Sequence, residues 1–508
     1  MRPLLALVIL LLAVGTTVPW WSAATRAAPG APRIATAAIV TLDPTQASNL
    51  DEFRLLDALF EPLLRLDTAT QQLRPALAER WECSADGKTW TFHLALCQWS
   101  DGSPVTAAQM ATGLERHRAG SASALPASLT TISASDGRTL VIASSQPLPT
   151  LPQILTSPVF IPWHPRLDEV GAWADPTRLP TCGPLRCRSW TPRHHYDLEP
   201  APFYTGPWRA NGPLRLQVVE DPGAAVRLYL DGRLDAVLRL NADTVGDLTR
   251  VGRADLHRGP SWGTEFIRLR CALRPGTADG RQPLDPRLRL ALARSIDRTA
   301  IVRDLLHGNG IVATTLVPPT AEALGYTPPT ALLAYDLAAA RALLVGVEVP
   351  PLELLMPSNQ PERVRVAEWL CDRWQRDLGV TVHLVSVPSG LATSRAKALD
   401  YDLVRGSLIG DYLDPAYFLG CFRGGSGMNR TGWRDAEYEA LLDRAESAAT
   451  EPERMALLAT AEARLLSQAP LIPLHHYACS FLVRPGLTGV RPNPLEQVHL
   501  SEVGWTAK

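Results

Sequence analysis

Catalytic motifs are incomplete in this chain of 508 residues. Gly308-Asn309-Gly310, with Ala313 after it, has glycine spacing like that of a dinucleotide-binding loop, but such a loop follows a strand. Here the glycines follow a helix-period segment, so we interpret them as a helix stop. The segment 424–428 (Gly-Gly-Ser-Gly-Met) lacks the last glycine of a nucleophile elbow. The residues therefore favour a binding protein over an enzyme.

Histidines and cysteines show no metal-ligand spacing. His194-His195 and His475-His476 are adjacent pairs, and adjacent side chains of a strand point to opposite faces. None of the eight cysteines forms a Cys-x-x-Cys motif or lies at a metal-like spacing from a histidine. We expect structural histidines, no metal and no cofactor.

The cysteines permit disulfides if the protein is exported. Cys182 and Cys187 are close enough in sequence to bridge, and so are Cys83 and Cys97 around an expected hairpin. The sequence alone does not choose among the possible pairings.

The N-terminus has the layout of a secretory signal peptide. Arg2 precedes an apolar run over 4–14, and small residues follow over 22–28. The run is shorter than the ~20 residues of a membrane span, and no cysteine for lipid attachment precedes Cys83. We expect a signal peptide over 1–28 and a periplasmic or other extracytoplasmic protein; a retained N-terminal anchor is the alternative.

Composition narrows the class of protein. The chain is 46% hydrophobic, and its 50 basic and 51 acidic side chains give a net charge of −1. Intrinsic disorder combines low hydrophobicity with high net charge and is excluded. Nucleic-acid-binding proteins carry a basic surplus, so we expect no nucleic-acid partner.

Strand and helix patterns alternate in both halves of the chain. Apolar periodicity and turn residues predict strands over 33–42, 89–94, 185–190, 196–199, 214–219, 265–269, 380–387 and 401–405. Helices are expected over 53–63, 224–230 and 364–378, and after Thr106, Asp285, Asp297, Asp435 and Thr450. Asp86-Gly87 predicts a hairpin turn before 89–94, and the strand over 401–405 should run into a loop over 406–415. This alternation predicts α/β lobes with a separate central sheet.

A series of short segments, taken in order, carries a family resemblance. These segments are Leu42-Asp43-Pro44, Leu59-Phe60-Glu61-Pro62-Leu63, Pro75-Ala76-Leu77-Ala78-Glu79-Arg80-Trp81, Trp90-Thr91-Phe92-His93-Leu94, Trp99-Ser100-Asp101-Gly102, Pro104-Val105-Thr106-Ala107, Gly183-Pro184, Asp285-Pro286-Arg287-Leu288-Arg289 with Asp297-Arg298, and Gly410-Asp411-Tyr412-Leu413-Asp414-Pro415. Together they resemble the extracytoplasmic oligopeptide- and dipeptide-binding proteins of ABC importers, solute-binding protein family 5. The resemblance extends from about residue 33 to the C-terminus.

The resemblance implies a three-lobed α/β fold of the periplasmic-binding-protein type. The expected lobes are a discontinuous lobe I (29–60, 178–270 and 481–508), lobe II (61–177) and lobe III (271–480). Ligand would lie between lobes I and III, which close about a hinge. The family does no chemistry, and the implied partners of the monomer are a small-molecule or peptide ligand and the permease subunits of an ABC importer.

The resemblance also implies ligand-binding residues. Asp411 matches the acidic residue that pairs with the α-ammonium group of a peptide, although it could instead only cap its loop. Arg405 matches an arginine near the pocket, where it can meet a ligand carboxylate or an acid that bridges the lobes. The backbone groups that pair with an extended peptide match Ser407, Leu408, Ile409 and Gly410, and the opposing segment of lobe I matches Ser48, Asn49 and Leu50.

Some positions depart from the family pattern. Thr112 stands where some oligopeptide binders have an aromatic residue, Leu408 stands where a tryptophan can lie, and Gln360 replaces an arginine of some dipeptide binders. The sequence therefore leaves two classes of ligand: a peptide, or another solute such as a glycoside, an opine or a metal chelate. An extracytoplasmic sensor that has lost transport is a further alternative, and an exported hydrolase is a more distant one.

Overall fold

A computed structural model describes residues 30–120, 125–273 and 282–506. The expected signal peptide over 1–28 lies outside these ranges. Within them, no helix is both long enough and apolar enough to cross a membrane.

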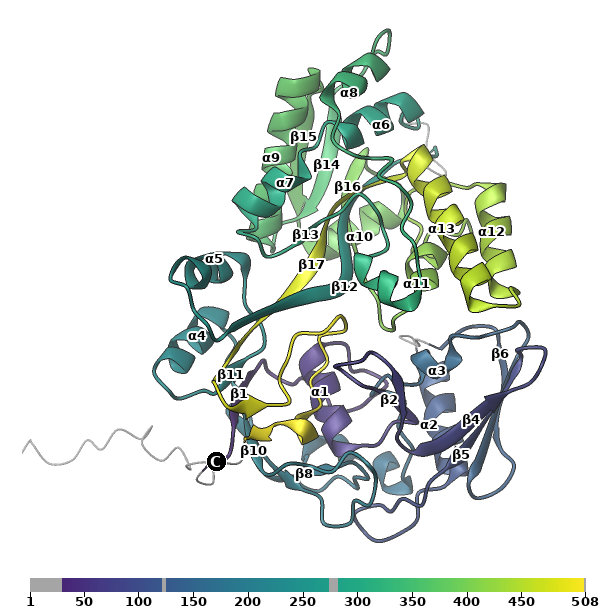
Figure 1. The fold of residues 1–508 in the computed structure, drawn as a ribbon, viewed down its shortest axis with the longest axis vertical. Coiled ribbons are helices and arrows are strands. Elements are labelled where there is room, and N and C mark those ends of the chain that lie inside the picture. The colour runs from purple at the N-terminus through teal and green to yellow at the C-terminus, as the bar shows by residue number, and fades with distance from the viewer. Residues whose placement is uncertain (1–29, 121–124, 274–281, 507–508) are drawn as a thin grey trace, which may run out of the picture.

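The largest sheet runs through the whole molecule. Its strand order is β15-β14-β16-β12-β17-β11-β1-β10-β9-β8, and β13 pairs with β17. Its strands are β1 Arg33–Thr36, β8 Leu185–Thr191, β9 His195–Pro200, β10 Leu214–Val218, β11 Ala236–Val237, β12 Leu256–Leu269, β13 Ile311–Val312, β14 Leu352–Pro357, β15 Val382–Val387, β16 Leu403–Ile409 and β17 Leu471–Val483. The long strands β12 and β17 pair antiparallel from Leu256↔Leu482 to Arg268↔Leu471. Figure 1 shows this pair running between two parts of the molecule. We call the part that contains α1, β4 and β8 the lower body and the part that contains β14, β15 and α13 the upper body.

The lower body contains the first helices and a second sheet. This sheet has the order β4-β5-β7-β6. The elements are α1 Leu50–Leu59, β2 Leu64–Leu66, β3 Leu73–Pro75, β4 Ala78–Cys83, β5 Thr89–Leu94, α2 Ala107–Ala119, β6 Leu129–Ala134, β7 Thr139–Ser144, α3 Leu151–Ile154, α4 Pro222–Leu230 and α5 Ala242–Arg250, with the short strands β18 Leu487–Thr488 and β19 Gly504–Trp505. One hydrophobic core joins α1, both sheets and the C-terminal segment through residues such as Phe60, Trp99 and Leu198.

The upper body packs helices around β14, β15 and β16. The helices are α6 Pro286–Arg294, α7 Arg298–Ala300, α8 Leu337–Leu343, α9 Pro361–Leu378, α10 Ser389–Lys397, α11 Pro415–Gly420, α12 Ala436–Glu446 and α13 Glu451–Gln468. β14 pairs parallel with both β15 and β16, and α9 and α10 make the connections between these strands. A separate core, with Trp262, Leu370 and Leu465 among its members, fills this body. The α/β class predicted from the sequence is confirmed, while the exact lobe boundaries stay predictions.

Two predicted strands end differently in the structure. The strand expected over 33–42 ends at Thr36, because the backbone N–H groups that follow donate hydrogen bonds to side chains of α1 instead of to a neighbouring strand. Ala37 N donates to Asp51, and Val40 N and Thr41 N donate to Glu52. The strand expected over 401–405 was predicted to run into a loop at Gly406. In the structure it continues as β16 through Ile409. A Cβ at Gly406 would lie 2.4 Å from Arg268 Nη1, so this glycine permits close packing against β12 rather than marking a turn.

Glu462 of α13 is fully buried and holds a loop against the helix. Its carboxylate accepts hydrogen bonds from Leu316 N (2.6 Å), Val317 N (2.8 Å) and Tyr326 Oη (2.5 Å). Burial raises the pKa of Glu462 from 4.5 to about 7, against the lowering effect of these donors. The folded protein therefore retains a proton that the unfolded chain releases above about pH 4.5.

This proton makes stability depend on pH. The stabilisation is full below about pH 4.5 and is lost as the pH rises through about 7. Between about pH 5 and pH 8, we expect the free energy of unfolding to fall by roughly 2–3 kcal/mol more in the wild type than in Glu462→Gln. Urea unfolding at both pH values measures the difference, with exposed Glu453→Gln on the same helix as the control. Equal pH slopes for the wild type and Glu462→Gln would contradict the assignment.

Candidate ligand-binding site

The segment from Arg405 to Gly410 has one paired edge and one open edge. It pairs antiparallel with β12, from Ile267↔Arg405 to Gly263↔Ile409. On the other side, β14 pairs with β16 only at Leu403 and Val404. No other described strand continues this edge.

The register shows which backbone groups face the open edge. Gly410 N donates to Trp262 O (2.8 Å), so the backbone groups of Gly410 and Leu408 point toward β12. Alternate residues of a strand direct their backbone groups to opposite edges, so those of Ser407 and Ile409 point toward the open edge. Ile409 is also 58% exposed, which is unusual for a large apolar side chain on a central strand.

Asp411 follows this strand and is held by its neighbours. A Cβ at Gly410 would lie 2.2 Å from the Trp262 ring, so glycine is required for the chain to pass this indole. Trp262 Nε1 then donates to Tyr412 O (2.8 Å). Asp414 accepts from Arg454 of α13 at 2.6 Å in a buried ion pair. These contacts fix both ends of the loop that carries Asp411.

The Asp411 carboxylate has no cationic partner among the described residues. The carboxylate accepts a hydrogen bond from Tyr417, whose Oη donates to Asp411 Oδ2 at 3.3 Å. Although Asp411 is exposed, surrounding protein atoms partly desolvate its carboxylate and raise the pKa, and the Tyr417 hydrogen bond opposes this effect. A desolvated carboxylate without a counter-charge is stabilised by an incoming cation.

Arg405 forms a buried cluster with residues from β12, β17 and α9. Its guanidinium donates to both oxygens of Glu265 (2.6 and 2.7 Å) and to Tyr477 Oη (3.2 Å). Arg363 Nη2 also donates to Tyr477 Oη (3.3 Å), and Arg363 Nε lies 3.7 Å from Glu265 Oε2. Burial alone would raise the pKa of Glu265, but the charge and hydrogen bonds of Arg405, together with the charge of Arg363 and a smaller effect of His475, lower it. The cluster lines a cavity of about 140 Å³.

The histidine pair of β17 is neutral. Burial lowers the pKa of His475 to about 4 and that of His476 to about 3. His476 Nδ1 is 2.7 Å from Thr264 Oγ1, and the His475 ring packs on Tyr477. These contacts confirm the expectation of structural histidines for this pair. Over the described ranges, no group of three or more His, Cys, Asp or Glu side chains is arranged to hold a metal ion.

The segment from Ser48 to Leu50 begins α1 in the lower body. Ser48 N donates to buried Glu52 (2.8 Å), and Asn49 Oδ1 accepts from Asp51 N and Glu52 N at the helix N-terminus. The side-chain oxygen of Asn49 is therefore engaged in capping α1. The side chain of Leu50 is 37% exposed. Among the described residues, no hydrogen bond or ion pair joins this segment to β16 or Asp411.

The structure thus gathers only part of the predicted site. Arg405, Ser407, Leu408 and Ile409 lie in β16, and Gly410 and Asp411 follow it directly in the upper body, whereas Ser48, Asn49 and Leu50 lie at the start of α1 in the lower body (Figure 1). Four further residues of this region were not predicted from the sequence: Glu265, Arg363, Tyr417 and Tyr477. Glu265 carried a usable signal, because a charged residue in an apolar strand needs a partner.

Proteins with related sequences cover nearly the whole chain. A dipeptide-binding protein of Bacillus subtilis, DppE, is 25% identical and covers 91% of this chain and 89% of its own length. A probable deoxycholate-binding periplasmic protein of Escherichia coli, YgiS, is 28% identical and covers 91% of each.

Solved structures share the fold. HbpA2 of Haemophilus parasuis has a TM-score of 0.81 at 21% identity, covering 94% of this chain and all of its own. The unliganded open form of the murein tripeptide-binding protein MppA has a TM-score of 0.79 at 23% identity, covering 94% of this chain and 98% of its own. These likenesses confirm the multi-lobed α/β fold. The model of the bacterial extracellular solute-binding proteins, family 5, matches residues 72–430, which is more than half of the chain. The protein is therefore an extracytoplasmic binding protein without enzymatic activity, and it belongs to the bacterial extracellular solute-binding proteins of family 5.

Proposed function

We propose that this protein is the substrate-binding component of an ABC importer and captures peptides. The observation that carries the proposal is the Asp411 carboxylate, which lacks a cationic partner among the described residues and lies next to the open edge of β16. A peptide offers one group for each feature, because its α-ammonium can pair with the carboxylate and its backbone can pair with the strand edge.

In this proposal the peptide adds to β16 as a short strand. The backbone groups of Ser407 and Ile409 pair with the peptide, and the exposed side chain of Ile409 contacts its side chains. Ser48, Asn49 and Leu50 form the opposing wall when lobe I closes on lobe III about β12 and β17. The closed monomer then delivers the peptide to a membrane permease.

The carboxylate end of the peptide is assigned to Arg363. Arg405 already gives two nitrogens to Glu265 and one of them also to Tyr477, so its role is to position β16 against β12. The Arg363 side chain is 33% exposed, against 12% for Arg405, and is the better placed of the two to meet a ligand from solvent.

Native mass spectrometry of gently purified protein tests the ligand class. Co-purified masses that fragment as peptides are expected. Thermal shift then compares a tripeptide with its N-acetylated form, which has no ammonium group. A bound ligand raises the melting temperature by mass action, so the free tripeptide should stabilise at concentrations at which the acetylated one does not. Equal stabilisation by both would contradict recognition of the ammonium group.

A bile acid is the second candidate ligand, because the relative YgiS is named as a probable deoxycholate-binding protein. Deoxycholate has a carboxylate and no ammonium group, so it would engage Arg363 rather than Asp411. Stabilisation by deoxycholate together with no stabilisation by any peptide would replace the peptide assignment.

A further inference from the structure

Cys97 and Cys182 lie side by side although 85 positions separate them in sequence. Cys97 Sγ donates to Cys182 O at 3.8 Å, so the Cys97 side chain lies against the backbone of Cys182. Cys97 is half-buried and Cys182 is buried. This contact differs from both pairings that sequence proximity suggested, because Cys187 Sγ donates to Ser189 O and Cys83 is exposed at the end of β4.

The backbone holds the two cysteines in place from both sides. Ser100 N donates to Thr181 O (2.7 Å), and Thr181 N donates to Ser100 Oγ (3.1 Å). Cys182 N donates to Leu59 O at the end of α1 (3.2 Å). Val105 N donates to Cys97 O (2.9 Å) and closes the turn that begins at Cys97. The contact is therefore set by the framework and does not depend on side-chain rotation alone.

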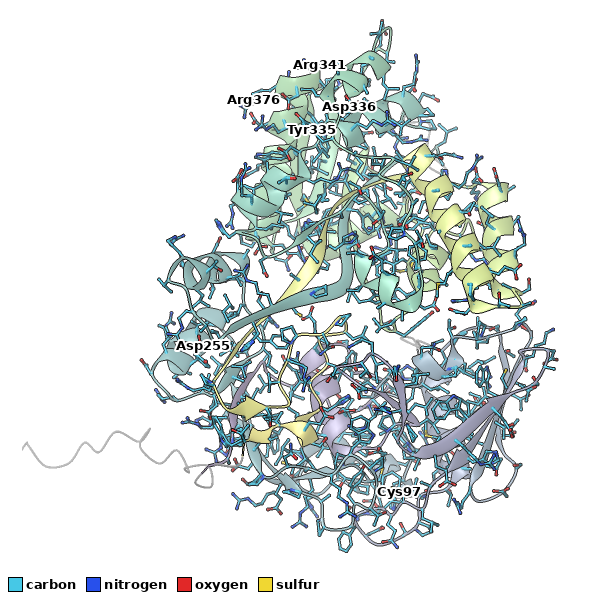
Figure 2. All side chains as sticks on the ribbon, in the orientation of Figure 1. Cys97, Asp255, Tyr335, Asp336, Arg341 and Arg376 are labelled. Atoms are coloured by element: carbon cyan, nitrogen blue, oxygen red, sulfur yellow. The ribbon has the colours of Figure 1, made fainter. Side chains whose placement is uncertain are left out.

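We propose that Cys97 and Cys182 form a disulfide in the exported protein. Extracytoplasmic compartments are oxidising enough to form and keep such bonds. The bond would close a loop that contains α2, β6, β7 and α3, at the point where the Cys182 backbone is hydrogen-bonded to the end of α1. Figure 2 places Cys97 at the bottom of the lower body, whereas β16 lies in the upper body (Figure 1), so the bond would stabilise the protein without touching the candidate ligand site.

The oxidant is a disulfide, either of a protein oxidase or of a small molecule. Cys97 is the more accessible thiol, so its thiolate attacks the donor disulfide, and one donor sulfur leaves as a thiol. The Cys182 thiolate then attacks the Cys97 sulfur of the mixed disulfide, and the second donor sulfur leaves. In total two cysteine thiols lose two protons and two electrons, and the donor disulfide takes them up to become two thiol groups.

Mass spectrometry of the protein isolated from its export compartment without reductant tests the proposal. The protein is denatured, alkylated with N-ethylmaleimide and digested. We expect one cross-linked peptide pair that contains Cys97 and Cys182, two hydrogens lighter than the sum of its parts. Alkylated Cys97 and Cys182, or a bond from either to another cysteine, would overturn the proposal whether or not the protein binds peptides.

Thermal unfolding with and without reductant measures the consequence. Because the bond restricts a long loop in the unfolded chain, we expect reduction to lower the melting temperature by roughly 5 °C in the wild type. The same shift is expected in Cys83→Ser, which removes an exposed cysteine, and no shift is expected in Cys97→Ser. A wild-type melting temperature that reductant leaves unchanged would count against the bond, and the peptide map decides if Cys97→Ser fails to fold.

Discussion

Replacing Asp411 by asparagine is expected to weaken the binding of a peptide with a free α-ammonium group by about 100-fold or more. The variant keeps the size of the side chain and removes the charge that would pair with the ammonium. Losing one partner of an enclosed, hydrogen-bonded charge pair costs on the order of 2–5 kcal/mol of binding free energy. Isothermal titration calorimetry with one tripeptide measures the ratio of the two dissociation constants.

The matched control is Asp443→Asn, which removes the same charge from an exposed position on α12. It should bind the tripeptide as the wild type does. The N-acetylated tripeptide should bind wild type and Asp411→Asn with similarly low affinity. If Asp411→Asn loses less than about 3-fold in affinity, Asp411 does not bind the ammonium group, and its role is limited to the hydrogen bond with Tyr417 within the loop.

The pKa of Asp411 adds a pH dependence to this binding. Because desolvation raises this pKa above 3.8, the carboxylate of the free protein takes up a proton at a higher pH than an ordinary aspartate does. Peptide affinity should therefore fall as the pH is lowered toward that pKa. The weak binding of Asp411→Asn should lack this component.

Local sequence signals predicted much of the fold. Thr106 caps α2 with a complete capping box, and Asp285 and Asp435 cap α6 and α12, as expected from the residue types. The Asp86-Gly87 turn lies between β4 and β5. Each of these features depends on residues a few positions apart, so the sequence around them is sufficient.

Features that depend on distant partners were less accessible. The strand β17 was not predicted, because its burial comes from pairing with β12 more than 200 positions earlier rather than from an alternating pattern. The candidate site likewise has a part that the local sequence predicts and a part that depends on distant residues. The motif around Asp411 carries its own signal, but the Glu265–Arg405 pair spans 140 positions, and its geometry emerges only when β12 and β16 are in register.

Replacing Glu265 by alanine should lower the free energy of unfolding by about 3–5 kcal/mol. The Glu265 side chain is 4% exposed and accepts two hydrogen bonds from Arg405, which is 12% exposed. Removing one partner of a buried ion pair leaves the other charge desolvated and unpaired, which is the costly case. Tyr477 Oη, which donates to the same carboxylate, would also lose its acceptor. Urea unfolding at neutral pH gives the difference.

Two comparisons separate the buried charge from a general loss of packing. The exposed pair of Arg250 with Asp247 offers the control Asp247→Ala, for which no measurable change is expected because exposed pairs are screened by water. Glu265→Gln keeps the shape and one acceptor but not the charge. Because the folded pKa of Glu265 is lowered, its stabilisation is present above its ordinary pKa of 4.5 and is lost as the pH falls through the folded value. The advantage of the wild type over Glu265→Gln should therefore shrink as the pH falls below 4.5 toward the lowered folded pKa. An advantage that does not change with pH would mean that packing, not charge, makes this strand pair stable.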